Sequence, residues 1–337
     1  MNGDESISLR VAMLEAIEKD LKSAIQPIQS DRYPELARMI HYHMGWLNDG
    51  QSGGKRIRPL IALLCCAAAG GDWRDALPAA SAIELIHNFT LIHDDIEDHS
   101  DTRRGRATLW KLWGIPQAIN TGDSIFTISR LTTRRLTETD ISPEIVLEAQ
   151  YTLDQACLRL TQGQHLDLAF ETQEKVSVDD YLEMIEGKTS ALITASSTIG
   201  ALFAGSPSSI IEKYRTFGHH LGLAFQVQDD ILGIWGDPEK TGKPASDDLR
   251  QRKKTLPTLY GIAKSSSFAD LFLQEFNQIA VEDLYEALNQ VDALDHTRDF
   301  SHQQTDIALQ ALQEAEPIEP AGRELINIAH RLTQRRS

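Results

Sequence analysis

The sequence predicts an all-α fold, a bundle of long helices, and three observations support this prediction. Apolar residues repeat at helical spacing along most of the chain. No convincing stretch alternates apolar and polar residues as a half-buried strand does, and no Asn-Gly or Asp-Gly pair lies between β-branched runs. Glycine- and proline-rich junctions separate the helical stretches without a long linker. We therefore expect one domain over residues 1–337, with a thick core or a central cavity.

The predicted helices follow one another along the chain. Residues 1–30 are expected to contain an N-terminal helix, because Leu9, Met13, Ile17 and Leu21 form one apolar stripe. Longer, largely apolar stretches predict four further helices, over residues 81–96, 145–168, 178–202 and 210–235. Residues 236–256 contain several Gly, Pro, Asp and Lys residues, so we expect an active-site loop there rather than a domain boundary.

Composition excludes some function classes. The net charge of −16 argues against nucleic-acid binding, which needs a basic face. The three cysteines lack metal-ligand spacing and predict reduced thiols in the cytoplasm. The longest apolar run, residues 60–71, is 12 residues long and too short to span a bilayer. The first apolar stretch is interrupted by charges, so we do not expect a signal peptide.

The strongest chemical signal is an acidic motif at residues 91–98. It ends an apolar helix with four carboxylates in five residues, including Asp94, Asp95 and Asp98. Asp94 and Asp98 are spaced i, i+4, so both point to one side of the helix. Such hard oxygen ligands suit Mg²⁺, which binds through one or two carboxylates and substrate phosphates. A solvated acidic helix end is the alternative, although negative charge opposes the helix dipole there.

A second acidic pair, Asp229 and Asp230, ends another apolar helix 135 residues after Asp94. Two such pairs facing each other across a bundle could clamp several metal ions around one diphosphate. A lone Asp-Asp pair would be weak support for this interpretation. The repetition of the same arrangement makes coincidence much less plausible.

Basic residues supply the third signal. The segment at residues 53–59 places Lys55 and Arg58 beside a glycine pair, just before a helix. Arginine binds phosphate in a bidentate manner and lysine adds a point charge, but this segment lacks the spacing of a Walker A loop. By itself it would indicate only ordinary surface charges at a helix start. Further cations recur beside the acidic motifs and suggest metal-bridged anions: Arg103, Arg104, Lys188, Lys243, Lys253 and Lys254.

Six motifs follow one another between about residues 40 and 260: GGKRIRP, HNFTLIHDDIED, DTRRG, GKT, FQxxDD and TGKP. In order and spacing the chain resembles the trans-isoprenyl (polyprenyl) diphosphate synthases, most closely the geranylgeranyl diphosphate synthases. The resemblance implies the isoprenoid synthase fold, mostly antiparallel helices around a central apolar cavity, and a homodimer. It also implies condensation of isopentenyl diphosphate with allylic diphosphates, with three Mg²⁺ ions in each active site.

The resemblance also implies roles for individual residues. The metal-binding residues that the resemblance implies are Asp94, Asp95, Asp98, Asp229 and Asp230. Asp94 and Asp98 would be direct ligands, and Asp229 would bind the third ion. The allylic diphosphate would contact Arg103, Lys188, Lys243 and Lys253. Isopentenyl diphosphate would be bound by Lys55, Arg58, His87 and Arg104, and the reacting centre lined by Thr189 and Gln226. The catalytic set is then Asp94, Asp98, Arg103, Lys188, Asp229 and Lys243.

One position departs from the family pattern. The second acidic motif usually ends in Asp, and here that position is Gly233. We expect Asp237 or Asp247 to supply nearby charge instead. The departure bears on rate or metal affinity more than on the reaction itself.

Product length is expected to depend on the residues one helical turn before Asp94, since one turn is about 5.4 Å. Thr90 lies nearly beneath Asp94 and Phe89 flanks it. An aromatic residue at this place resembles the geranylgeranyl (C20) synthases and can act as the floor of the cavity. Farnesyl (C15) and C25 products remain open, as does a plain packing role for Phe89.

Three other functions are weighed against this one. A class I terpene cyclase would not need a second diphosphate site at Lys55, Arg58 and His87. A helical His-Asp metal phosphohydrolase would use the dipeptide His93-Asp94 but leaves the paired aspartates unexplained. A non-catalytic partner subunit is suggested by Gly233, and the intact first motif argues against it.

Overall fold

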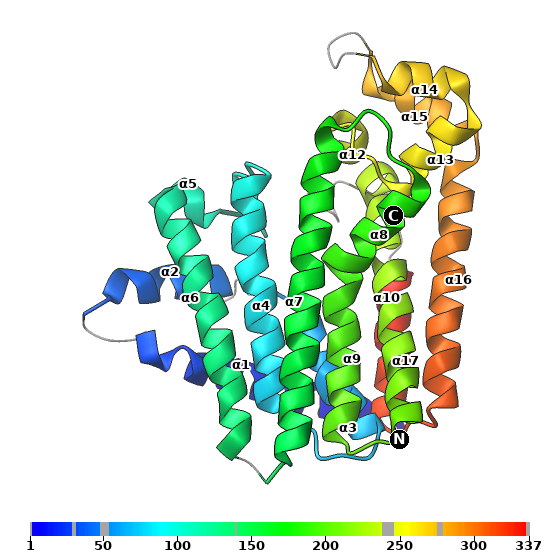
Figure 1. The fold of residues 1–337 in the computed structure, drawn as a ribbon. Helices are drawn as coiled ribbons and strands as arrows, with labels where there is room; N and C mark the ends of the chain where they lie inside the picture. The colour runs from blue at the N-terminus through cyan, green and yellow to red at the C-terminus, as the bar shows by residue number, and fades with distance from the viewer. Residues whose placement is uncertain are drawn as a thin grey trace. The chain divides into compact units, whose positions relative to one another are not determined.

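The computed structural model describes residues 2–28, 32–47, 54–138, 140–237, 246–274 and 279–334, and it confirms the all-α fold (Figure 1). Where the sequence predicts long helices at residues 81–96, 145–168 and 210–235, the structure has helices slightly longer than predicted. In chain order the elements are α1 (Asn2–Ala24), η1 (Gln26–Ile28), α2 (Pro34–Met44), α3 (Ile57–Ala68), α4 (Leu77–Glu97), β1 (Thr102–Arg103), β2 (Arg106–Ala107), α5 (Leu109–Trp113), α6 (Ile115–Arg134), η2 (Arg135–Glu138), α7 (Pro143–Thr172), α8 (Val178–Ile185), η3 (Glu186–Ser190), α9 (Ala191–Phe203), α10 (Ser208–Trp235), α12 (Asp247–Arg250), α13 (Leu256–Lys264), α14 (Ser266–Phe272), α15 (Val281–Asn289), α16 (Ala293–Glu314) and α17 (Ala321–Thr333).

The chain divides into two compact units. The first unit comprises Met1–Asp154, Ala195–Glu212 and Glu316–Leu325. The second unit comprises Gln155–Thr194, Lys213–Ala315 and Ile326–Ser337. The single domain and the central cavity expected from the sequence stay predictions.

In the first unit, the N-terminal helix α1 is anchored through its apolar stripe. Met13, Ile17 and Leu21 are fully buried, as their four-residue spacing predicts. Near the start of the same helix, Arg10 donates to the buried carboxylate of Glu324 on α17 at 2.9 Å. Two residues separated by 314 positions in the sequence are therefore neighbours in this unit.

Helix α4 forms the centre of the first unit. Its apolar residues Ile83, Leu85 and Ile86 are fully buried, and it packs along α6 (Figure 1). The two helices approach closely because Gly122 of α6 has no side chain. A Cβ atom at that position would lie 2.4 Å from Nε2 of His93. This packing fixes the helix that carries the first acidic motif.

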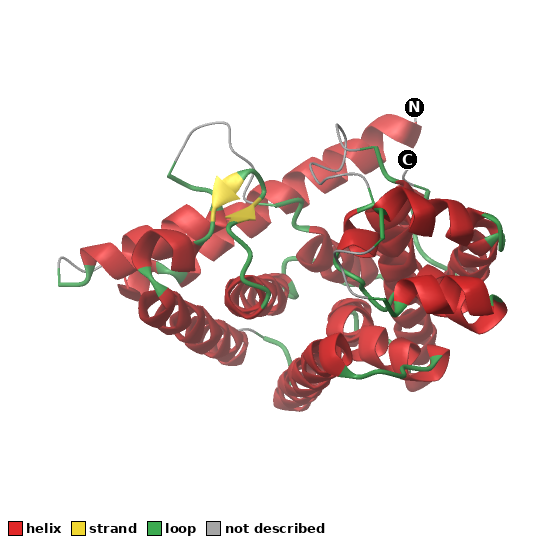
Figure 2. Cartoon of the chain, turned by 90° about the horizontal axis from the view of Figure 1, so that it is seen from above, coloured by secondary structure: helices red, strands yellow, loops and turns green. Residues whose placement is uncertain are grey.

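A short hairpin follows α4, although the sequence showed no convincing strand. Strands β1 and β2 pair in antiparallel fashion, with Thr102 opposite Ala107 and Arg103 opposite Arg106 (Figure 2). Arg104 and Gly105 form its turn with positive φ angles of 52° and 73°. Because each strand has only two residues, an alternating pattern could not reveal them.

The stretch predicted as one helix over residues 178–202 is three elements. Helix α8 begins with a capping box between Ser177 and Asp180. A π-helical turn, η3, then separates α8 from α9. Gly163 of α7 and Gly187 of η3 let the two backbones touch, since a Cβ on Gly163 would lie 2.1 Å from the backbone nitrogen of Lys188. Such a turn inside a helix often marks a functional site.

Among the described residues, no helix combines the length and the apolar character that a membrane span requires.

Candidate active site

The predicted site residues are distributed over both compact units. The first unit holds Lys55, Arg58, His87, Phe89, Thr90, Asp94, Asp95, Asp98, Arg103 and Arg104. The second unit holds Lys188, Thr189, Gln226, Asp229, Asp230 and Lys253. Lys243 lies outside the described residues. The expectation that the two acidic motifs face each other stays a prediction, so each half is described by itself.

The first acidic motif ends α4 as predicted. Asp94 is half-buried and Asp98 is exposed, one turn later. The backbone N–H of Asp98 donates to the backbone oxygen of Asp94 at 2.8 Å, which fixes the helix end. Within the part of the chain that the structure describes, no three His, Cys, Asp or Glu residues gather in a way that could hold a metal by themselves.

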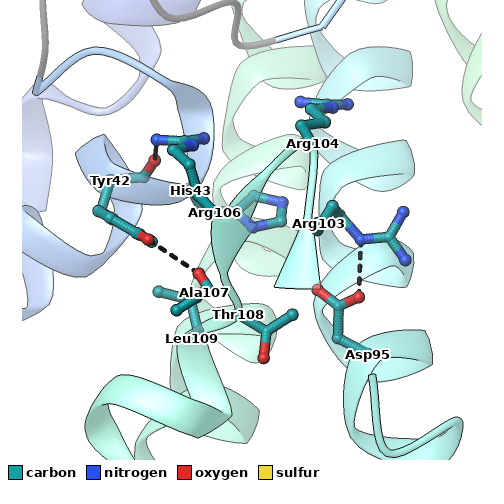
Figure 3. A pocket seen from close by; sticks show the side chains of 9 residues that line it. All are labelled: Tyr42, His43, Asp95, Arg103, Arg104, Arg106, Ala107, Thr108 and Leu109. Carbon is teal, nitrogen blue, oxygen red and sulfur yellow. Dashed lines mark hydrogen bonds and ion pairs between the residues drawn. The ribbon is translucent and has the colours of Figure 1, made fainter. Parts of the chain in front are cut away.

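Asp95, between them in sequence, has a different environment. It is buried, and its Oδ1 accepts a hydrogen bond from Nε of Arg103 at 2.7 Å (Figure 3). Burial raises the pKa of Asp95 to about 6, although Arg103 acts in the opposite direction. Asp95 thus fixes Arg103 through an ion pair that links α4 to the hairpin.

The hairpin arginines surround a pocket, which Figure 3 shows. The imidazole of His43 lies among Arg103, Arg104 and Arg106. Burial and then the neighbouring arginines, Arg104 first, lower the pKa of His43 well below its usual value. Burial likewise lowers the pKa of Arg104 to about 10. Burial is the main cause of both shifts, and the arginines beside His43 add a positive field that a bound anion would offset. The pocket is lined by Tyr42, His43, Asp95, Arg103, Arg104, Arg106, Ala107, Thr108 and Leu109.

The basic loop before α3 meets the same hairpin. Gly54 has a φ of 116°, and a Cβ there would lie 2.7 Å from Nη2 of Arg104. On the following helix, Nη1 of Arg58 lies 3.2 Å from Nε2 of His87. Burial and then the Arg58 charge lower the pKa of His87 well below its usual value. The structure thus brings Arg58, His87 and Arg104 into one cationic region, while Lys55 is exposed beside it.

Arg56 is a residue that the sequence interpretation missed. Its side chain is buried, and it donates to Glu18 at 2.6 Å and to Glu84 at 2.9 Å. It also donates to the backbone oxygen of Met44. Arg56 therefore anchors the loop between the two phosphate-binding candidates, Lys55 and Arg58. Only its position between them could have indicated this, since one sequence does not distinguish a buried arginine from an exposed one.

Phe89 lies one turn before the motif and is held between two rings. Its ring meets that of His93 edge to face, with centroids 5.1 Å apart. On α6, the ring of Phe126 lies at the same centroid distance, tilted by 54°. Thr90 is buried and donates to the backbone oxygen of His87 at 2.8 Å. A floor at this level would thus involve Phe126 as well as Phe89.

In the second unit, the π turn η3 positions Lys188 and Thr189. Lys188 forms an ion pair with Asp167 of α7, a residue that the sequence interpretation did not select. Asp167 lies one helical turn after Gly163, so the close glycine contact and the ion pair fix the same turn. Lys253 is exposed.

The second acidic motif lies in the last two turns of α10 and contains two unlike carboxylates. Asp229 is half-buried, whereas Asp230 is buried and accepts hydrogen bonds from Tyr181 and, at 3.1 Å, from Gln226. Burial raises the pKa of Asp230 to about 7. Gln226 also accepts a hydrogen bond from the Thr189 hydroxyl at 2.6 Å. The structure therefore joins Thr189, Gln226 and Asp230, and the metal-binding role predicted for Asp230 stays a prediction.

Gly233 has a neighbour that the sequence did not indicate. A Cβ at this position would lie 2.0 Å from Oδ2 of Asp248, which is buried. The carboxylate of Asp248, rather than Asp237 or Asp247, thus occupies the space of a side chain at position 233. The usual third aspartate of the motif could not be accommodated unless Asp248 moved.

Comparison with protein families gives one match that covers most of the chain. The family model described as polyprenyl synthetase matches residues 35–291.

Curated proteins and solved structures agree with this match. The chain is 42% identical over 273 residues to the geranylgeranyl diphosphate synthase of Mycobacterium tuberculosis, covering 79% of this chain and 77% of that protein. It is 43% identical over 239 residues to the (2E,6E)-farnesyl diphosphate synthase of the same organism, over 69% of this chain, and spans 65% of that protein's length. The crystal structure of geranylgeranyl pyrophosphate synthetase from Pyrococcus horikoshii aligns with a TM-score of 0.89 at 29% identity, covering 100% of both chains.

Proposed function

Because the chain belongs to the polyprenyl synthetase family, we propose that it condenses isopentenyl diphosphate with allylic diphosphates to a short-chain all-trans prenyl diphosphate. The product we propose is geranylgeranyl diphosphate (C20). The observation that carries the proposal is the cationic region of the first unit. There, Arg58, His87 and Arg104 lie close together beside the helix that ends in Asp94 and Asp98.

Mg²⁺ is the metal we propose, with three ions in each active site. Asp94, Asp98 and Asp229 would hold the ions, and Asp95 would lie close by. The half-buried or exposed carboxylates of these three are hard oxygen donors that suit Mg²⁺. When bound, Mg²⁺ supplies charge stabilisation to the leaving diphosphate. Oxygens of a bound diphosphate would contribute further ligands to the ions.

The side chains of this protein bind and orient the two substrates. Lys55, Arg58, His87 and Arg104 bind isopentenyl diphosphate, while Arg103, Lys188, Lys243 and Lys253 bind the allylic diphosphate. The allylic C–O bond breaks with its electron pair leaving on the diphosphate, and the double bond of isopentenyl diphosphate forms the new C–C bond. The proton lost next goes to the released diphosphate. No side-chain nucleophile is required, because positioning and charge stabilisation carry the reaction.

Product length is proposed to depend on the pair Phe89 and Phe126. Their rings contact each other one to two turns from Asp94, where a growing apolar tail would meet them. A farnesyl (C15) product is the second candidate, favoured by the 43% identity to a farnesyl diphosphate synthase.

A homodimer is proposed from an exposed apolar stripe on α7. Leu147, Tyr151 and Leu158 are each at least half exposed and are spaced to share one side of the helix. Large exposed apolar residues in a row are typical of association surfaces. Size-exclusion chromatography with light scattering tests this: wild type should be dimeric, and Leu147→Asp/Tyr151→Asp should be monomeric. The cytoplasmic location stays a prediction.

One experiment tests the proposed reaction directly. The purified protein is incubated with Mg²⁺, isopentenyl diphosphate and each allylic diphosphate in turn, and the dephosphorylated products are sized by chromatography. We expect a C20 product that disappears when EDTA replaces Mg²⁺. A C15 end product would select the farnesyl alternative, and no condensation with any allylic substrate would refute the proposal.

A further inference from the structure

Four side chains in the second unit form a continuous hydrogen-bonded relay. Tyr181 of α8 donates its hydroxyl to Oδ2 of Asp230. Nε2 of Gln226, one turn earlier on α10, donates to Oδ1 of Asp230 at 3.1 Å. Thr189 of η3 donates its hydroxyl to Oε1 of Gln226 at 2.6 Å. The relay thus joins three elements and ends at the π turn.

The chemistry of these groups fixes the direction of every bond. Three donors converge on Asp230, the third being the backbone N–H of Leu256 at 3.4 Å, so both oxygens of this side chain accept hydrogen bonds. The amide of Gln226 must therefore turn its NH₂ group toward Asp230. Its carbonyl oxygen then faces Thr189, whose hydroxyl has to donate. The lone pairs of the Thr189 oxygen consequently point away from Gln226.

Burial makes the relay rigid and gives Asp230 an environment different from that of Asp229. Tyr181 is 1% exposed and Asp230 is 4% exposed. Tyr181 also packs in an apolar cluster with Val227 and Leu256, so water does not compete for these bonds. Both oxygens of Asp230 already accept protein donors, while Asp229 is half-buried.

We propose that Asp230 is a positioning residue that acts through Gln226 on the hydroxyl of Thr189. The relay holds the lone pairs of Thr189 in one orientation, which the proposed reaction uses to stabilise the positive charge that develops on the allylic carbon. This role rests on the proposed function and replaces a metal-binding role for Asp230. It assigns to Tyr181 the task of holding the carboxylate from the opposite side.

Exchange of the two relay partners provides the test. Gln226→Glu places two acceptors against each other, and Asp230→Asn removes the carboxylate that orients Gln226. The double variant Gln226→Glu/Asp230→Asn reverses donor and acceptor, keeps the net charge and still accepts from Thr189 and Tyr181. We expect each single variant to lower kcat by about 10- to 100-fold and the double variant to recover to within about 5-fold of wild type.

Three further measurements distinguish a positioning role from metal binding and from a purely structural role. The Mg²⁺ concentration for half-maximal rate should be unchanged in Asp230→Asn and raised in Asp229→Ala. The thermal midpoint of unfolding, measured without Mg²⁺, should recover in the double variant. Tyr181→Phe should lower kcat less than either single variant, Gln226→Glu or Asp230→Asn. A double variant no faster than its slower parent, or an Asp230→Asn enzyme that needs more Mg²⁺, would overturn the proposal. An inactive wild type would instead refute the proposed function.

Discussion

The two units of this protein present their polar residues in opposite ways. In the first unit, cationic side chains gather around His43 and His87, whose pKa values are lowered first by burial and then by neighbouring arginines. In the second unit, hydrogen bonds join Thr189, Gln226 and Asp230 in a relay, and the buried end of this relay lies in an apolar cluster.

The difference indicates two distinct tasks. A cluster of cationic side chains gains stability from a bound anion, so it is suited to binding diphosphate. A saturated relay gains nothing from an anion, but it holds a hydroxyl in one orientation before the substrate arrives. The following variants test this difference between the two units.

Asp94→Ala should have the largest effect. It removes a hard ligand from the proposed metal site, and turnover should fall by about a thousandfold or more. Circular dichroism should report an unchanged helical fold. Glu97→Ala, an exposed carboxylate on the same helix end, is the matched control and should retain most activity. Comparable Mg²⁺-dependent rates in wild type and Asp94→Ala would be incompatible with the proposed site.

Arg58→Ala and Lys188→Ala should each impair a different substrate. Loss of a charge-assisted contact should raise the KM for isopentenyl diphosphate in Arg58→Ala by about 10- to 100-fold. Lys188→Ala should raise the KM for the allylic substrate instead. Arg38→Ala, at an exposed arginine, serves as control. The assignment fails if Arg58→Ala impairs only the allylic substrate.

Gly233→Asp should have an intermediate effect, through packing. Two carboxylates would compete for the space that Asp248 fills, which should lower the free energy of unfolding by about 1–3 kcal/mol and slow turnover. Gly233→Asp/Asp248→Gly should restore both quantities by moving the carboxylate back. Gly233→Asp/Asp247→Gly removes the adjacent aspartate and should not. A more stable Gly233→Asp protein with a lower Mg²⁺ requirement would contradict the predicted clash with Asp248.

Phe89→Ala should change the rate least, because it alters the product rather than the reacting groups. Removing the ring that meets Phe126 opens space for about one further five-carbon unit, unless the space collapses. The product should shift from C20 to C25 or longer at a similar rate of the first condensation. Thr90→Phe should shorten the product. An unaltered product distribution in Phe89→Ala would leave this residue a packing role only.

Sequence patterns predicted those parts of the protein that depend on local periodicity and composition. The helices at residues 81–96, 145–168 and 210–235 are present, and the first acidic motif ends its helix where expected. The helix predicted over residues 178–202 is interrupted, because Gly163 and Gly187 bring two distant backbones together. Periodicity within one segment carries no information about such a contact.

The same limit explains the site residues that were missed. Asp167 and Asp248 matter because of the residues they meet, Lys188 and Gly233, and neither belongs to a motif that would mark it. Arg56 lies inside a motif, but its burial against Glu84 depends on how α3 and α4 pack. Motifs indicated which residue types carry the chemistry, and tertiary packing decided which of them act as supports.

The ion pair between Arg10 and Glu324 has a consequence for synthesis on the ribosome. Translation proceeds at roughly 5–20 residues per second, so Glu324 is made on the order of 16–60 seconds after Arg10, from which it is separated by 314 positions. During that interval helix α1 lacks this ion pair, although the helices that it packs against, α3, α4 and α6, have already been made. Slow codons late in the message should therefore prolong the period in which Arg10 lacks its partner, while the apolar stripe of α1 can already pack.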